Sequence, residues 1–568
     1  MKVVSGSEFD ASLSRAPCAH VVPEEAWSCP NEGRMICSNC NIVAYCSKDC
    51  QRNHWRTHKQ DCKDPVRASD WKPAWVLEMR EPSFVSGQES SNWLSRLKPI
   101  ALGMTLWGNV PAMDIVNLTH NEIIAKDLVL AFVASGDLRN LILTVNRLPS
   151  DYSGQLTVVL NDYNPHIVLR NVLLLMILGT YADRHSAVDV ALHFWYSAFI
   201  PIQYEVLVQE AILRFTKQLG SGGTISCPLS STSSMTGLIG PKIVELIQTS
   251  YGASYGFDDV VNEINRVRFE PSRIDRHHRQ YTRLEPSHRL AFLEFRRFGI
   301  VLPFGARNDH FNTPNRFLFS PEGTWLQNDL ANPLNSWDPL AVVEAGKAHG
   351  AVRADLYGCL YFYLSDLLRE FADRLGRFRI SFRMFQSDAG ELSKAMRSGA
   401  LSHYGLPATT RFDRIDVSNI IDIEYMGIPR VLSDWGPQLN SDANKHASLI
   451  GYSMNWAAHQ QGAKAEQDDD IKRSIEILSS QYAGIISAYH HSFTAVYDNS
   501  SAFEKYLASQ DLKKVLLTSR LKRKSTHTIF PHRLCAPFDG PASALPVFAN
   551  DESWYLNVCP MVHNADTC

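Results

Sequence analysis

Cysteine is crowded into the start of this chain: seven of its twelve cysteines lie within the first 62 of 568 residues. From Cys37 to Cys62 the spacing is C-x2-C-x5-C-x3-C-x7-H-x3-C, with two more cysteines upstream. The possible ligands are Cys18, Cys29, Cys37, Cys40, Cys46, Cys50, His58 and Cys62. Such a set suffices for two tetrahedral zinc ions. Because so short a segment buries little apolar surface, we expect metal to hold it together.

The second half of this cysteine-rich segment has the sequence features of a helix. Ser47 is a favourable N-cap, and Asp49 falls in the first turn, where a carboxylate interacts well with the helix dipole. The pairs Cys46/Cys50 and His58/Cys62 are each four residues apart, so each pair can share one side of a helical turn. His54 is out of phase with His58, and we do not expect it to be a ligand.

The run YCSKDCQRNHWRTHKQDC, residues 45–62, resembles the second half of a MYND-type zinc finger. The resemblance implies two zinc ions held by interleaved ligand pairs. One ion would be bound by Cys37, Cys40, His58 and Cys62, and the other by Cys18, Cys29, Cys46 and Cys50. The family usually opens with C-x2-C, whereas ten residues separate Cys18 from Cys29 here. His20 is the alternative ligand to Cys18.

The charge of the finger indicates what kind of molecule it can bind. Residues 18–63 hold six basic and five acidic side chains, a sum of +1, which does not predict a nucleic-acid-binding stripe. Closed coordination leaves no open position for catalysis. MYND fingers dock proline-containing peptides, so the resemblance implies a protein partner, bound here around Trp55 and Gln51. The alternative is a finger that only packs on its own chain.

Composition limits the class of protein and its compartment. The net charge of −3 implies no polyanionic partner. The start, MKVVSGSEFD, lacks the features of a signal peptide, and the apolar run at residues 168–181 is too short to cross a bilayer. We therefore expect an intracellular protein with reduced cysteines and no membrane association. The basic run at residues 520–524 leaves nucleus and cytoplasm both open.

The body shows a pattern of strands and helices. The sequence predicts a helix over residues 121–134, buried parallel strands at 141–145 and 156–160, and a long apolar helix from Pro165. This order is typical of a βαβ unit. Asp162 follows the second strand, at the edge where doubly wound folds bind nucleotides. The loop 135–140 holds Gly136 and Asp137 but no GxGxxG, so a turn with a helix cap is the competing interpretation.

The middle of the chain lacks the alternation of strands and helices that the sequence predicts for residues 106–200. Residues 201–404 read as a mostly helical insertion, with a low-complexity mobile loop at 220–237. The arginine-rich stretch 266–297 also contains acids, which favours a solvated helical face with ion pairs over a nucleic-acid surface. A buried strand at 412–418 and a helix at 427–439 then return to the α/β pattern.

The body carries two further resemblances. The runs LWGNVPAMDIVNLTHNE, GDLRNLILTVNRLP and GQLTVVLNDYNPHIVLRN resemble a domain of unknown function that follows MYND fingers in fungal proteins and begins dynein axonemal assembly factors. The stretch FDRIDVSNIID resembles the fourth strand of class I methyltransferases. This implies S-adenosylmethionine as cofactor, with Gly136, Asp137 and Asp162, and further Asp416 and Asn419, lining its crevice.

These observations together predict an α/β protein with an N-terminal MYND finger and a Rossmann-like, class I methyltransferase-like body. The expected units are a disordered tail (1–16), the finger (17–63), a linker (64–105), a first α/β part (106–200), the helical insertion (201–404) and a second α/β part (405–568). The predicted function is an adaptor or regulatory protein that binds partners through the finger. The alternatives are a methyltransferase, active or degenerate, and an assembly scaffold for a large complex.

Overall fold

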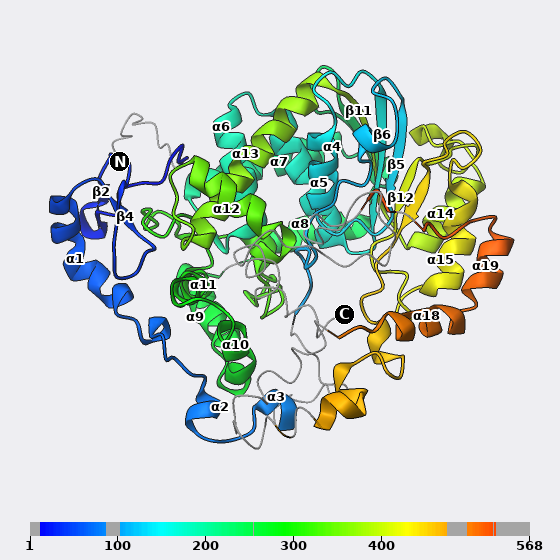
Figure 1. Ribbon diagram of the computed structural model, residues 1–568. Helices are drawn as coiled ribbons and strands as arrows, with labels where there is room; N and C mark the ends of the chain where they lie inside the picture. Colours follow the sequence, from blue (N-terminus) through cyan, green and yellow to red (C-terminus); the bar gives the residue numbers. More distant parts are fainter. Residues whose placement is uncertain are drawn as a thin grey trace.

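A seven-stranded sheet forms the centre of the body (Figure 1). The structure is a computed structural model that describes residues 12–86, 103–253, 255–473, 477, 497–525 and 527–529. The strand order is β13-β12-β5-β6-β11-β9-β8, and only β8 runs antiparallel to its neighbour. The strands are β5 (Leu128–Phe132), β6 (Gln155–Asp162), β8 (Thr224–Pro228), β9 (Ser234–Leu238), β11 (Arg379–Gln386), β12 (Arg414–Asp416) and β13 (Ser448–Ile450).

Both faces of this sheet are covered, because successive side chains of its strands point to opposite sides and both sets are apolar. Leu128, Leu130 and Phe132 of β5 lie in one core, whereas Ala131 and the following Val133 lie in the other. The sheet is therefore the middle layer of an α/β/α arrangement, as a largely parallel sheet requires.

The first face is covered by the longer helices. These are α4 (Arg139–Arg147), α5 (Pro165–Thr180) and α13 (Leu356–Arg377), with α6 (Arg184–Tyr196), α7 (Ile202–Gln218) and α8 (Pro241–Gly252) packed on α5. The second face carries α14 (Ala389–Arg397) and α15 (Gly427–Trp435), and α18 (Ser500–Ser509) and α19 (Leu512–Thr518) follow beside α15. Between finger and sheet lie α9 (Phe257–Arg268), α10 (Ile274–Tyr281), α11 (Pro286–Phe298) and α12 (Pro339–Ala348) (Figure 1).

Two predicted elements near the first strand are wrong. Residues 121–127 form turns, and the predicted helix gives way to strand β5, since the apolar run at 128–133 has its two faces buried in separate cores. The predicted strand at 141–145 is the middle of helix α4. Leu141 and Val145, four residues apart, are both buried there on one side of the helix. The βαβ unit is therefore β5-α4-β6. Its first strand is β5, at 128–132, and the segment predicted as its first strand is the helix α4.

The stretch 201–404 is not a separate helical insertion, because it supplies three strands of the same sheet. Strand β11 lies between β6 and β9, in register from Arg379↔Gln155 to Gln386↔Asp162. The predicted mobile loop at 220–237 forms most of the β8-β9 hairpin instead. The predicted strands at 156–160 and 412–418 do lie in this sheet, as β6 and β12.

The segments that flank the finger also differ from expectation. Residues 12–16 pack on the body, where the Tyr361 hydroxyl accepts a hydrogen bond from the Leu13 N–H (2.9 Å). Within the predicted linker, residues 65–68 contact α11 and residues 74–86 pack along α10. Trp75 is fully buried there, and Asp275 binds Arg80 through both carboxylate oxygens. Residues 1–11, 87–102 and 530–568 of the predicted units lie outside the described residues.

The arginine-rich stretch is largely interior rather than a solvated face. Arg266 forms the expected exposed ion pair with Glu263. Five other arginines of the stretch are buried: Arg268, Arg273, Arg279, Arg289 and Arg296. Arg273 binds the buried carboxylate of Asp329 at 2.5 Å, which offsets the cost of removing its charge from water. Over the described part of the chain, no helix has the length and apolarity needed to cross a membrane.

Candidate metal centre

The finger consists of two small hairpins and one helix. The hairpins pair β1 (Val21–Val22) with β2 (Trp27–Ser28), and β3 (Met35–Ile36) with β4 (Ala44–Tyr45). Helix α1 (Lys48–Cys62) begins at Ser47, whose hydroxyl accepts a hydrogen bond from the Cys50 N–H at 3.2 Å. The helix thus starts at the residue that the sequence predicts, and it carries Cys50, His58 and Cys62 toward the hairpins.

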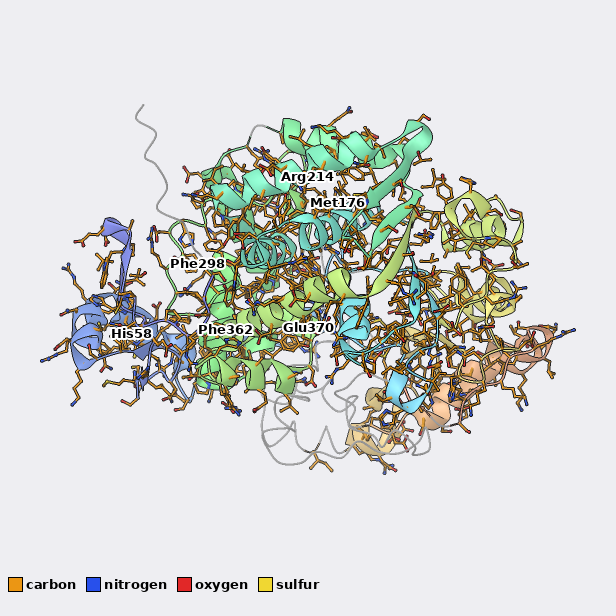
Figure 2. The ribbon with its side chains drawn as sticks, turned by 90° about the horizontal axis from the view of Figure 1, so that it is seen from above. His58, Met176, Arg214, Phe298, Phe362 and Glu370 are labelled. Carbon is orange, nitrogen blue, oxygen red and sulfur yellow. The ribbon has the colours of Figure 1, made fainter. Side chains whose placement is uncertain are left out.

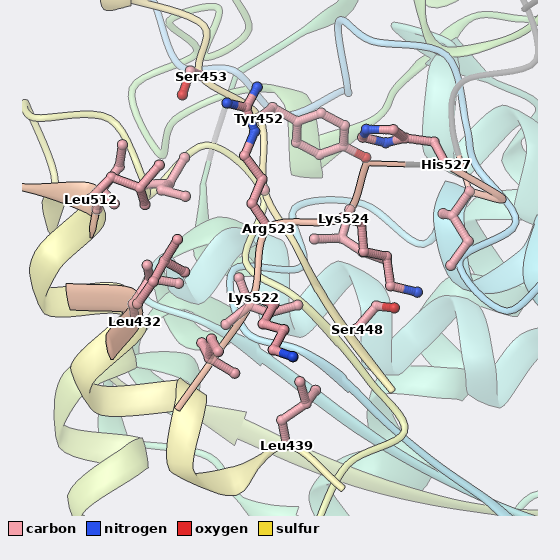
Figure 3. Close-up of a pocket in the computed structure, with 18 of the residues that line it drawn as sticks. Leu432, Leu439, Ser448, Tyr452, Ser453, Leu512, Lys522, Arg523, Lys524 and His527 are labelled. Atoms are coloured by element: carbon pink, nitrogen blue, oxygen red, sulfur yellow. The ribbon is translucent and has the colours of Figure 1, made fainter. Parts of the chain in front are cut away.

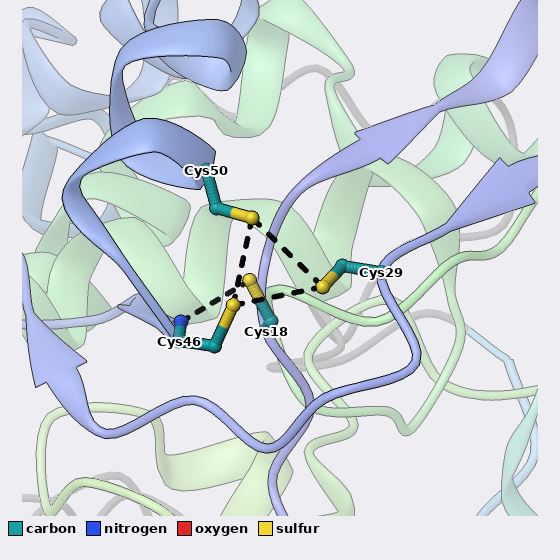
Figure 4. Close-up of side chains that lie close together, drawn as sticks. All are labelled: Cys18, Cys29, Cys46 and Cys50. Atoms are coloured by element: carbon teal, nitrogen blue, oxygen red, sulfur yellow. Dashed lines mark hydrogen bonds between the residues drawn. The ribbon is translucent and has the colours of Figure 1, made fainter.

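The first cluster joins Cys18, Cys29, Cys46 and Cys50 (Figure 4). The Sγ–Sγ distances are 3.7 Å from Cys29 to Cys46, 3.5 Å from Cys46 to Cys50 and 3.9 Å from Cys29 to Cys50. The Cys46 N–H donates to the Cys18 sulfur at 3.3 Å, which holds the two ends of the cluster together. All four sulfurs lie within 4.8 Å of one another.

The second cluster joins Cys37, Cys40, His58 and Cys62, all of them buried. Cys37 Sγ lies 3.9 Å from Cys62 Sγ, and Cys40 Sγ lies 3.4 Å from His58 Nε2. Outside the cluster, the Asn39 amide donates a hydrogen bond to the Cys62 sulfur at 3.0 Å. Burial lowers the pKa of His58 to about 4, so its imidazole is neutral at pH 7 and able to bind a metal.

The spacing within both clusters fits zinc. A tetrahedral ion with zinc–sulfur bonds of about 2.3 Å separates its sulfurs by about 3.8 Å. The distances above scatter around that value, and these cysteines are free thiols rather than disulfides. Burial raises the pKa of the Cys18 and Cys40 thiols to about 12, so a metal that binds them must displace their protons. The chemistry is that of closed structural sites.

The two groups of four are the same sets that the family resemblance implies. Cys18 lies in one group with Cys29, Cys46 and Cys50. Its alternative, His20, lies outside both groups and packs its ring against Trp27 at a centroid distance of 5.1 Å. His54 is also outside, and its Nδ1 shares a hydrogen bond with the Tyr45 hydroxyl at 3.0 Å. Both histidines pack around the clusters rather than joining them.

One side of the finger is attached to the body (Figures 1 and 2). Figure 2 shows His58 in the finger beside the helices that carry Phe298 and Phe362. Arg289 of α11 donates hydrogen bonds to the carbonyl oxygens of Val66 and Ala68, both at 2.6 Å. Ser287 donates to the Cys40 carbonyl at 2.7 Å, and Arg297 pairs with Asp64 at 3.0 Å. On this side the finger packs on its own chain, as the alternative to peptide binding supposes for the whole finger.

Carboxylates meet at this contact. Burial, helped by the nearby Asp61 carboxylate, raises the pKa of Glu294 to about 8, although Arg297 opposes the shift. Glu294 is therefore largely protonated at pH 7. A protonated Glu294 adds no negative charge beside Asp61 and Asp64, which lie on the finger side of the same contact.

The outward face of α1 is left open. Six of its side chains line a shallow groove, which we call the α1 groove: Arg52, Trp55, Arg56, Lys59, Gln60 and Lys63. The Trp55 side chain is 39% exposed. The four basic residues follow at spacings of four, three and four, so they form one stripe along the helix. The charge sum of +1 over the whole finger does not show that four basic side chains gather on one side of α1. Their helical spacing in the sequence could have shown it. Gln51 lies outside the lining of the groove.

In the body, the predicted cofactor residues meet at the carboxyl ends of β5, β6 and β12. The Asp162 carboxylate accepts hydrogen bonds from the Gly136 N–H and the Asn164 N–H, both at 2.9 Å. Helix α5 is capped by Asn164, which accepts from His166, so Asp162 is not the cap. Instead it links the β5-α4 loop to the end of β6. Burial raises the pKa of Asp162, and the two backbone hydrogen bonds oppose that shift.

The other predicted acids are also held by the protein itself. Asp137 is buried, accepts from the Gly108 N–H at 2.7 Å and pairs with Arg139 at 2.6 Å. Asp416 is buried and accepts from the Asn140 amide at 3.0 Å and from the Ser418 N–H at 2.9 Å. Asn419 lies in the turn after β12, outside these contacts. The structure therefore brings Gly136, Asp137, Asp162 and Asp416 to one edge of the sheet.

One residue at this edge has no sequence motif to mark it. Arg170 of α5 is 3% exposed, and among the described residues its Nε and Nη2 have no hydrogen-bond partner. Burial lowers its pKa, while Asp137 and Asp162 act in the opposite direction, so these carboxylates lie within electrostatic reach. Gly136 adopts φ +53°, and nothing lies within 4 Å of the place where a side chain would begin. An open backbone loop and an unpaired cation thus share this edge.

The arrangement defines a class of protein: a mixed α/β body with a zinc-binding finger at its N-terminal side. Comparison with known families is more specific. Residues 27–62 match the MYND finger, and residues 106–200 match a domain of unknown function, DUF4470. A SET and MYND domain-containing protein of Dictyostelium discoideum is 56% identical over 34 residues, which are 6% of this chain and 6% of that protein. No solved structure matches the chain.

Proposed function

We propose that this protein is an adaptor that binds other proteins through the α1 groove of its MYND finger. The observation that carries the proposal is the division of the finger into two sides. One side is fixed to α11, where Ser287 donates a hydrogen bond to the Cys40 carbonyl, whereas α1 presents Trp55 and its basic stripe outward. Both metal clusters use four protein ligands, so neither offers a position for catalysis. MYND fingers generally mediate protein interactions, which supports the same conclusion.

The groove favours a particular kind of peptide. An exposed indole is a flat apolar platform on which proline packs well, because proline loses little conformational entropy when bound. Arg56, Lys59 and Lys63 surround that platform and form no ion pair with the described residues. We therefore propose a proline-containing segment flanked by acidic residues, with charge complementarity setting its rate of association.

A peptide-binding experiment tests this function. Binding of proline-containing peptides, with and without flanking acids, is measured on the zinc-loaded chain by fluorescence anisotropy. We expect Trp55→Ala to weaken the best peptide at least tenfold, because a central aromatic anchor is worth about 2 kcal/mol or more. Tyr425→Ala, which removes an exposed aromatic of the body, is the matched control and should change nothing. Equal binding by both variants would refute the proposal.

A second candidate function is that of an S-adenosylmethionine-dependent methyltransferase, active or degenerate. The observation that favours it is the edge where Gly136, Asp137, Asp162 and Asp416 meet beside Arg170. In doubly wound folds, nucleosides bind at the carboxyl ends of adjacent parallel strands. Asp162 would accept hydrogen bonds from a ribose, because a carboxylate has about four acceptor positions and two are taken here. Arg170 would pair with the cofactor's carboxylate.

Calorimetry with S-adenosylmethionine tests this second candidate. We expect Arg170→Met to weaken binding at least tenfold, since a hydrogen bond to a charged group is worth about 1.5–3 kcal/mol. Nε and Nη2 of Arg170 have no hydrogen-bond partner among the described residues, so the substitution takes no hydrogen bond of these two atoms from the described fold. Arg411→Met, at an exposed position, is the control. Absence of binding heat at millimolar ligand, on folded zinc-loaded protein, would exclude the cofactor site.

A further inference from the structure

A cavity of about 480 Å³ lies beside β13, at the outer edge of the sheet (Figure 3). It is separate from the α1 groove, and its lining residue Ile450 is the strand partner of Asp416. Three helices each present two apolar side chains, four residues apart, to the same space. The pairs are Ile428 and Leu432 of α15, Phe503 and Leu507 of α18, and Leu512 and Leu516 of α19. Residues four apart lie on one side of a helix, so these walls follow directly from the sequence.

The fourth wall is the outer strand of the sheet. Ser448, Leu449 and Ile450 of β13 line the cavity, followed by Tyr452. Within the described residues, β13 pairs only with β12, so its other edge faces this space. The cavity is partly open to solvent, so a ligand can enter it from outside. It falls within the volume range of small-molecule sites, and its apolar walls disfavour filling by water alone.

The rim of the cavity is basic. The segment after α19 contributes Lys522, Arg523, Lys524 and His527, whereas none of the described residues that line the cavity is Asp or Glu. Figure 3 shows Lys522 and Lys524 extending to the side where Ser448 lies, while Arg523 extends toward Ser453. Arg523 is paired with Glu504 at 2.7 Å.

The two lysines have no such partner. Neither Lys522 nor Lys524 forms an ion pair with a described residue. The Glu122 carboxylate acts on Lys524 electrostatically and raises its pKa. That carboxylate already forms an ion pair with Arg414, with Oε1 2.8 Å from Nη1. Burial and the Arg414 cation lower the pKa of Lys524. The pKa of His527 is lowered chiefly by burial and further by the Arg523 and Lys524 cations. The rim is therefore a region of uncompensated positive charge.

We propose that this cavity binds a single-chain amphiphile, with its alkyl chain against the leucine walls and its anionic head group at Lys522 and Lys524. The apolar walls select the chain, because every methylene that leaves water for an apolar wall favours binding. The two ammonium groups select a negative head. A carboxylate and a phosphate share this chemistry, so the ligand is a long-chain carboxylic acid or a long-chain phosphate monoester.

Displacement of a fluorescent fatty acid from the full chain tests the proposal. The competitors are hexadecanoate, hexadecyl phosphate, hexadecanol and hexadecyltrimethylammonium. We expect at least one anion to displace the probe at tenfold lower concentration than the alcohol, and the cation to be weakest. Which anion is stronger decides between the carboxylate and the phosphate as the natural head group.

Variants then locate the ligand. Lys522→Glu combined with Lys524→Glu should weaken the anions at least tenfold and leave the alcohol unchanged. Lys513→Glu combined with Lys514→Glu, on the exposed side of α19, makes the same charge change away from the cavity and should have no effect. Leu516→Trp fills the cavity and should abolish binding of every competitor.

Two results would overturn the proposal. The first is no displacement by any hexadecyl compound from a chain whose thermal melting shows it folded. The second is equal displacement by the anions and the alcohol, unaffected by charge reversal at Lys522 and Lys524.

Discussion

Removal of zinc is expected to unfold residues 18–62 while the α/β body keeps its fold. Elemental analysis of the purified chain should give two zinc ions, and chelation should make the finger sensitive to proteolysis. The reason is energetic: structural zinc contributes about 10–16 kcal/mol to folding of such small modules. The finger's hairpin strands are only two residues long, so little else holds its loops. Far-ultraviolet circular dichroism should retain most of the helical signal.

Single substitutions show which cluster binds each of the two zinc ions. Cys40→Ser should remove one zinc ion, and Cys18→Ser should remove the other. Cys227→Ser changes a buried cysteine outside both clusters and should leave two ions bound. A zinc content of one in the unaltered chain, unchanged by Cys18→Ser, would show that Cys18 is not a ligand. A finger that resists proteolysis after complete chelation would contradict its dependence on metal.

Glu122→Ala is expected to destabilise the body by about 3–5 kcal/mol, the cost of leaving one partner of a buried ion pair alone. Arg414 of β12 is fully buried, and its guanidinium binds both carboxylate oxygens of Glu122, at 2.8 and 2.9 Å. The Asn444 amide donates to the same carboxylate at 3.0 Å. Without Glu122, the Arg414 charge would stay in the interior with carbonyl oxygens as its neighbours.

Urea unfolding followed by tryptophan fluorescence measures this loss. Glu122→Gln retains a hydrogen-bond acceptor of the same size, and we expect an intermediate loss. Glu344→Ala removes an exposed pairing with Lys347 and should change stability by less than about 1 kcal/mol. If Glu122→Ala unfolded at the same urea concentration as the unaltered chain, Arg414 would have to find other partners at no cost.

The finger could be predicted from sequence far better than the body, because metal coordination is local chemistry. Sulfur and imidazole spacing limits which side chains can reach one ion, and the ends of α1 follow from Ser47 and its neighbours. The apolar run of β5 was ambiguous, since 121–134 satisfies a helical period almost as well as a buried strand. Only its tertiary partners, the two cores on either face, decide for the strand.

Pairing over long distances explains the remaining differences. Strand β11 alternates polar and apolar residues, with Ile380, Phe382 and Met384 buried, which is the pattern of a strand. That pattern does not say that the strand belongs beside β6, more than 200 positions earlier in the chain. The apolar pairs of α15, α18 and α19 can each be found from helical spacing, but only the fold brings them together beside β13. Arg170 belongs to no motif and is identified only by its burial and missing partners.

The position of β5 and β6 has a consequence for how this protein can be divided. Residues 106–200, which match DUF4470, contain both strands, but their outer neighbours, β12 and β11, come from beyond residue 378. Cut out at these limits, the stretch would carry a two-stranded ribbon with rows of bare backbone donors and acceptors on either side. Such edges recruit other chains and lead to aggregation. The limits of the family match therefore enclose only part of a larger folding unit, and any fragment meant for expression must include β11 and β12.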